Sequence, residues 1–172
     1  YNSMTSRLLV DKIEGKTTSG KIQMPSGHIL QTLSSTKLDQ QGISTSDYTD
    51  LTDLSVTITP FFSSSKILIT AHVYASWTDS GMLRLMRDST RIPNNTQGDS
   101  EVRRGFALVR HGANNEGNTY SVQHLDAPAT TSATVYKIQA SRESGSGTME
   151  INRRYVNNIY SLVSSITVQE IA

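Results

Sequence analysis

The segment from Lys66 to Trp77, KILITAHVYASW, alternates along its whole length between an apolar set and a mixed set of side chains. Successive side chains of a β-strand point to opposite faces of its sheet, whereas a helix needs apolar residues at every third or fourth position. The segment therefore predicts a strand with one face on a hydrophobic core. The residues of that face are Ile67, Ile69, Ala71, Val73, Ala75 and Trp77.

Similar segments recur along the chain, and no amphipathic helix longer than two turns is apparent. The 24 Ser and 20 Thr residues make up about a quarter of the 172 residues, which favours strands and turns over helices. Clusters of Gly and Asn separate the segments and mark chain reversals. The sequence therefore predicts an all-β, antiparallel sandwich or barrel. Its further strands are expected at residues 28–33, 54–59, 81–87, 102–110, 119–126, 134–141, 147–152 and 158–171.

Two of these segments support more detailed predictions. Residues 54–59 alternate strictly and stop at Pro60, and a short turn then leads into the long strand at Lys66. This spacing predicts a hairpin between the two strands. Residues 164–171 alternate almost to the last residue, which predicts a terminal strand in the centre of a sheet.

Composition excludes several classes of protein. The net charge of +1, from 16 basic and 15 acidic side chains, is too balanced for a protein that coats nucleic acid. The chain has no cysteine, so it has no disulfide, thiolate metal site or cysteine nucleophile, and no apolar run is long enough to span a bilayer.

Motifs for catalysis and metal binding are also missing from the sequence. It contains no Gly-x-Ser-x-Gly elbow, no His-Glu-x-x-His and no phosphate-binding glycine loop, and its four histidines are dispersed. The acidic residues 47–53, DYTDLTD, lack the Gly and Glu of a calcium-binding loop and are predicted as a solvated loop. We therefore expect no enzyme activity, no cofactor and no bound metal.

Three places could contact a ligand. Trp77 could offer a stacking surface to a sugar ring, although its phase with Ile67 and Val73 favours a core position. Arg103 and Arg104, like the later pair at residues 153–154, present planar guanidinium groups suited to carboxylate or phosphate, as in an acidic glycan. The alternative for the arginines is a solvated strand face or salt links between neighbouring chains.

Residues 1–27 differ from the rest and are predicted to be an N-terminal extension, with the β domain spanning residues 28–172. The apolar patch near the start of the extension is too short to form a core alone, so it would be ordered only by docking on the sandwich or on another chain. The residues expected to make this docking contact are Leu8, Leu9, Val10, Ile13, Ile22 and Met24.

Three segments carry a resemblance to a known group of proteins: LLVDKIEGKTTSGKIQMPSGHILQ at residues 8–31, YTDLTDLSVTITPFFSSSKILITAHVYAS at residues 48–76, and SSITVQEIA at residues 164–172. Together they resemble structural proteins of tailed phages, especially fibre and decoration proteins of phages that infect cyanobacteria. The likeness covers about a third of the chain. Residues 78–154 show no such likeness.

The resemblance implies a jelly-roll head similar to that of tumour necrosis factor and complement-type trimers, with three copies packed around an axis on the surface of a phage particle. It implies a trimeric tail fibre that attaches to the host surface, with the N-terminal segment bound to other virion proteins of the tail or capsid. Host-surface glycan is a further expected partner, and neither nucleic acid binding nor membrane insertion is expected. Alternatives are a capsid head fibre or cement protein, and a monomeric, soluble carbohydrate-binding module.

One feature of the residues agrees with a trimer. The second face of the long strand carries Leu68 and Tyr74, apolar groups that a monomer would have to expose, and exposed apolar patches often mark interfaces. The alternative is a second layer of the same chain covering that face.

Overall fold

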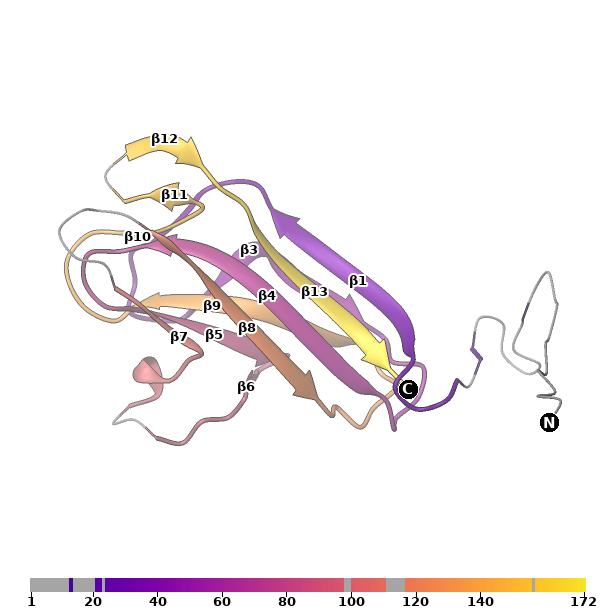
Figure 1. Cartoon of the computed structure of the whole chain (residues 1–172). Helices are drawn as coiled ribbons and strands as arrows, with labels where there is room; N and C mark the ends of the chain where they lie inside the picture. The colour runs from indigo at the N-terminus through magenta and orange to yellow at the C-terminus, as the bar shows by residue number, and fades with distance from the viewer. Residues whose placement is uncertain (1–12, 14–20, 23, 98–99, 111–116, 156) are drawn as a thin grey trace, which may run out of the picture.

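The computed structural model describes residues 13, 21–22, 24–97, 100–110, 117–155 and 157–172. These residues form two antiparallel β-sheets packed face to face, which confirms the all-β sandwich (Figure 1). The only helical element among the described residues is a 3₁₀ turn at Glu101–Arg103, and no helix in this part of the chain could cross a membrane. The strands are β1 (Ile29–Lys37), β2 (Gln41–Ile43), β3 (Thr49–Ile58), β4 (Lys66–Ser76), β5 (Gly81–Arg87), β6 (Thr90–Ile92), β7 (Ala107–Val109), β8 (Asn118–Asp126), β9 (Thr134–Arg142), β10 (Met149–Ile151), β11 (Arg153–Arg154), β12 (Asn157–Ser161) and β13 (Ser164–Ile171).

The first sheet is built around β4. Strand β13 lies between β1 and β4, and β8 pairs with the opposite side of β4. Beyond the start of β13, β10 continues the pairing with β4 and in turn pairs with β2. The second sheet has the order β3, β9, β5, with both β6 and β7 paired to the remaining side of β5. Strands β11 and β12 form a separate hairpin.

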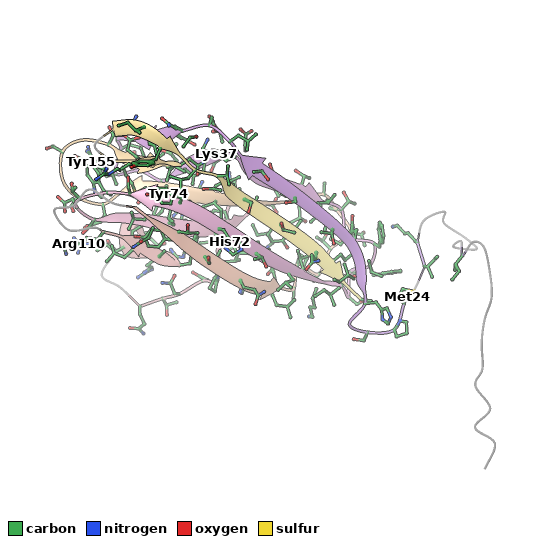
Figure 2. All side chains as sticks on the ribbon, turned by 45° about the horizontal axis from the view of Figure 1, so that its top comes forward. Met24, Lys37, His72, Tyr74, Arg110 and Tyr155 are labelled. Carbon is green, nitrogen blue, oxygen red and sulfur yellow. The ribbon has the colours of Figure 1, made fainter. Side chains whose placement is uncertain are left out.

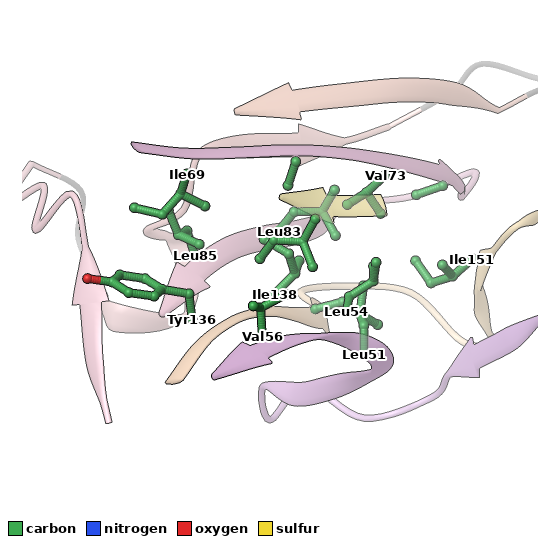
Figure 3. Packing of buried hydrophobic residues seen from close by; sticks show 14 of the residues in the cluster. Leu51, Leu54, Val56, Ile69, Val73, Leu83, Leu85, Tyr136, Ile138 and Ile151 are labelled. Carbon is green, nitrogen blue, oxygen red and sulfur yellow. The ribbon is translucent and has the colours of Figure 1, made fainter. Parts of the chain in front are cut away.

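The core lies between the two sheets, and the alternation of β4 explains how it forms. All six apolar residues predicted to face inward, from Ile67 to Trp77, are buried. They meet alternate residues of β3, β5 and β9 from the other sheet, including Leu54, Leu83 and Ile138 (Figure 3). Because these side chains leave water together, the two faces stabilise each other.

The predicted hairpin at residues 54–66 is wrong. Strand β3 pairs with β9 in one sheet, and β4 pairs with β13 and β8 in the other, so residues 59–65 form an arch between the sheets. Pro60 and Ser65 are buried within this arch. A hairpin strand and an arch strand share the same two-residue alternation, so the pattern predicts the strands but not their pairing.

Three other expected boundaries also change. Residues 158–171 divide into β12 and β13 because Leu162 and Val163 lie outside both strands. In residues 102–110 only Ala107–Val109 form a strand. The acidic segment predicted as a loop lies largely within β3, where a bulge places Asp53 at a φ of 61°.

The two ends of the sandwich differ in what they carry. At one end the backbone of Gly27 donates to the carbonyl of Ala172 at 3.0 Å, and Ala172 donates to His28 at 2.9 Å. The β11–β12 hairpin lies at the opposite end (Figure 1). The terminal strand β13 is flanked on both sides by β1 and β4, which confirms its predicted central position.

Candidate functional site

The middle of the outer face of the first sheet, beyond Lys66 at the start of β4, is an uncharged surface that crosses four strands. The strand registers bring its residues into four rows, and no Asp, Glu, Lys or Arg stands at these positions. The rows are Thr32–Gln169–Leu68–Leu125, Ser34–Thr167–Thr70–Gln123, Thr36–Ser165–His72–Ser121 and Tyr74–Thr119. We call these 14 residues the uncharged face.

Side chains within the uncharged face hydrogen-bond to one another across the strands. The hydroxyls of Ser34 and Thr167 lie 3.0 Å apart, and His72 Nδ1 lies 2.8 Å from the Ser121 hydroxyl. The opposite sheet differs, because Lys137 there pairs with Asp50 at 2.7 Å. The centres of protein interfaces are depleted of charged residues, so this contrast distinguishes the first sheet as the candidate interface.

Both residues predicted to contact another subunit lie on the uncharged face. Leu68 and Tyr74 are half-buried, and Leu125, which sits directly opposite Leu68 on β8, is 54% exposed. On β4, His72 lies between Leu68 and Tyr74. Figure 2 labels His72 and Tyr74 on this strand. Leu125 joins this apolar group only through the β4–β8 pairing, which residue spacing in the sequence does not reveal.

A pocket of about 470 Å³ lies at the end of the uncharged face, under the β11–β12 hairpin. Tyr74 belongs to both surfaces and contributes to the pocket from β4. The hairpin and the chain after it contribute an arginine, a second tyrosine, a hydroxyl and a leucine. The lining residues are Tyr74, Gly117, Arg154, Tyr160, Ser161 and Leu162.

Asn152 holds the hairpin over the sheet. Its φ of 60° lies in the left-handed region, which Asn adopts more readily than most residues, and there the chain turns from β10 into β11. Its buried side-chain amide donates to the carbonyls of Lys37 at 2.9 Å and Asp39 at 3.0 Å. The backbone N–H of Asn152 donates to the backbone carbonyl of Tyr74 at 3.0 Å. The backbone N–H of Leu162 donates to the carbonyl of Asn152, also at 3.0 Å. Both sides of the pocket are therefore fixed to one residue.

Gly117 makes room for the ring of Tyr74. A Cβ atom at position 117 would lie 2.5 Å from both Cζ and the hydroxyl oxygen of Tyr74, and 2.8 Å from Cβ of Ser76. These separations are shorter than real contacts, so a larger residue would displace the tyrosine or the strand. Glycine at this position therefore keeps the tyrosine ring in the pocket wall.

The charges beside the pocket are divided between two neighbouring arginines. Arg153 Nε lies 3.4 Å from the carboxylate of buried Glu150. Burial raises the pKa of Glu150, and the Arg153 guanidinium lowers it by a smaller amount. Arg154 instead contributes to the pocket, with its guanidinium 6.0 Å from the centre of the Tyr160 ring. Among the described residues, the Nε atoms of Arg153 and Arg154 are both buried and have no hydrogen-bond partner.

The predicted receptor-contact residues lie elsewhere. Trp77 is 1% exposed, and its ring packs edge to face with that of Tyr155, with the ring centres 5.3 Å apart. It therefore occupies the core position that its phase favoured and cannot stack on a sugar. Arg103 donates to Glu143 at 2.8 Å, and Arg104 pairs with Glu101. These are salt links within one chain.

The N-terminal residues predicted to contact the particle are only partly described. Leu8, Leu9 and Val10 lie outside the described residues. Ile13 is 61% exposed, Met24 is 40% exposed and Ile22 is half-buried. Figure 2 shows Met24 at the opposite end of the molecule from Tyr74 and Tyr155.

No family model matches the chain, and no curated protein matches it either. Within the described part of the chain, no group of three or more His, Asp or Glu side chains is arranged to hold a metal ion.

Proposed function

We propose that this chain is a structural protein of a tailed phage particle, a trimeric tail fibre whose β head contacts the host surface. Its activity is adhesive, and its N-terminal extension binds other proteins of the particle. The observation that carries the proposal is the uncharged face, which lacks charged residues as the centres of interfaces between subunits do.

The strand order supports a jelly-roll head. Successive long strands alternate between the sheets: β3 lies in the second sheet, β4 in the first, β5 in the second, β8 in the first, β9 in the second and β13 in the first. A jelly roll likewise divides eight antiparallel strands between two sheets through interlocked Greek keys.

The placement of the ends supports attachment at a distance from the particle. Strand β4 runs between the two ends of the head. It begins at Lys66, which pairs with Ile171 at the end of β13, and Tyr74 lies eight residues further along, in the pocket wall. At the rise of an extended strand this separation is about 26 Å. In the proposed fibre, the end beside residues 24–28 faces the particle and the pocket end faces outward. Three such heads on one fibre would strengthen a weak contact through their high effective concentration.

Light scattering coupled to size-exclusion chromatography tests the trimer. One chain has a mass of 18.9 kDa, so the expected species has about three times that mass. Thr70→Arg places a charge in the centre of the uncharged face and should yield monomers. The matched control is Thr57→Arg, because Thr57 is exposed on β3 of the other sheet and this variant should stay trimeric. A wild-type mass of one chain overturns the trimer.

Electron microscopy of the encoding phage tests the location. Antibodies against the chain should label the tail. Label on the capsid would replace the tail fibre with a head fibre or cement protein. Particles without label would overturn the virion role.

A further inference from the structure

We propose that the pocket under the β11–β12 hairpin binds an acidic saccharide, that is, a sugar ring bearing a carboxylate. This inference rests on the attachment role proposed above, because it names the ligand class that the outward end of the head would contact. The pocket's size, its two tyrosine rings and its arginine carry the argument.

The pocket has the size and lining of a small-molecule site. Its volume of about 470 Å³ lies within the range of ordinary ligand pockets, which are largely apolar with a few directed polar groups. Tyr74 and Tyr160 contribute aromatic rings from different elements, and Tyr160 is 55% exposed. A tyrosine ring offers an apolar surface to the C–H groups of a sugar, and its hydroxyl can bond to the sugar's own hydroxyls.

Arg154 gives the pocket its preference for an anion. It is the only charged residue among the described lining residues, and its neighbour Arg153 is the one that pairs with Glu150. A carboxylate matches the planar guanidinium group and can accept two parallel hydrogen bonds from it.

The backbone fixes these groups before a ligand arrives. The Ser76 hydroxyl donates to the carbonyl of Arg153 at 3.0 Å, which ties β11 to the end of β4. Together with the turn at Asn152, this contact sets the position of Arg154 relative to Tyr74. A preformed site loses less entropy on binding than one that must be ordered by its ligand.

Saturation-transfer NMR and calorimetry on the full chain test the site with four probes: glucuronate, an oligomer of glucuronate, glucose and acetate. The two glucuronate probes should bind, and glucose and acetate should bind at least about tenfold more weakly, as expected when a bond to a charged group or the ring contact is absent. Acetate binding as tightly as glucuronate would reduce the pocket to a simple anion site. Equal binding of glucose would overturn the role of the charge.

Variants connect the binding to the named residues. Arg154→Gln should weaken glucuronate binding about tenfold or more. Arg154→Lys should weaken it less, because lysine keeps the positive charge but cannot donate two parallel hydrogen bonds from a planar group. Tyr160→Ala removes an exposed ring without disturbing the core and should also weaken binding. Lys66→Gln removes an exposed positive charge at the other end of β4 and should leave binding unchanged. Full glucuronate binding by both Arg154→Gln and Tyr160→Ala would overturn the assignment.

The mass of each preparation separates this inference from the proposed function. A trimer that binds none of the probes overturns the saccharide site and leaves the fibre proposal standing. A monomer that binds glucuronate overturns the trimer and leaves the site.

Discussion

The carboxylate of Glu170 accepts the backbone N–H of Phe61 at 2.7 Å, across 109 positions of sequence. Glu170 is fully buried, and it also accepts a bond from the side-chain amide of Gln31 at 2.6 Å. Phe61 belongs to the arch that carries the chain from β3 to β4. The last strand therefore holds the connection between the two sheets in place.

Replacing Glu170 with Ala should destabilise the fold. The N–H groups of the arch would lose their acceptor, which costs about 1–3 kcal/mol in the free energy of unfolding. Urea denaturation measures this loss, and Thr57→Ala, at an exposed position of β3, is the control. Glu170→Gln keeps one acceptor oxygen and should lose less. Equal stability of Glu170→Ala and the control would contradict the role assigned to this carboxylate.

Asn152→Ala should loosen the hairpin that covers the pocket. The change leaves two carbonyls without their amide donor and puts alanine at a positive φ, so we expect a loss of at least about 2 kcal/mol in unfolding free energy. Asn152→Gly tolerates the φ and should recover part of that loss. Thermal melting of both variants, beside Asn118→Ala on an exposed strand position, measures the two contributions. A variant Asn152→Ala as stable as Asn118→Ala would rule out this anchoring role.

Glu150 should make stability fall as pH rises. Burial raises the pKa of Glu150 in the folded state. Above a pH of about 4.3, the ordinary pKa of a glutamate, the unfolded chain therefore releases this proton before the folded chain does, and the free energy of unfolding falls as the pH rises. Glu150→Gln removes the titration. The melting temperature of Glu150→Gln minus that of the wild type should therefore increase from pH 4 towards neutrality, while the other carboxylates, common to both proteins, cancel. A difference that shrinks with rising pH would contradict the assignment.

Ile69→Ala and Leu68→Ala should differ although the residues are adjacent. Ile69 is fully buried, and its truncation should cost about 2–5 kcal/mol of unfolding free energy. Leu68 lies on the uncharged face, so its truncation should chiefly weaken self-association. Denaturation and mass measured at the same protein concentrations separate the two effects. A large loss of folding stability for Leu68→Ala in monomers would place that residue in the core.

Much of the candidate interface could be predicted from alternation. The period of two puts Ile69 inside and Leu68 outside, and the same phase places Trp77 in the core and Tyr74 on the outer face. Burial on one face is a local consequence of the pleat, so it can be predicted one strand at a time.

The pocket could be predicted only in part. The pair of arginines at residues 153–154 suggested anion binding, but residue spacing could not distinguish Arg154, which lines the pocket, from Arg153, which pairs with Glu150. Tyr160 gave no signal, because the sequence predicts residues 158–171 as a single strand. The pairing of β12 with β11, which spacing in the sequence does not reveal, brings this tyrosine to the pocket that Tyr74 also lines.

The sequence by itself determined that the chain is all-β, which residues of β4 face the core, and that the last strand is central. Only the tertiary structure decided that β3 and β4 lie in different sheets, and that Tyr74, Gly117, Arg154 and Tyr160 surround one pocket. The physical reason is the separation in sequence between the residues that interact. Alternation records the environment of each side chain relative to its own strand, whereas strand partners are selected by contacts between distant segments, such as that of Glu170 with Phe61.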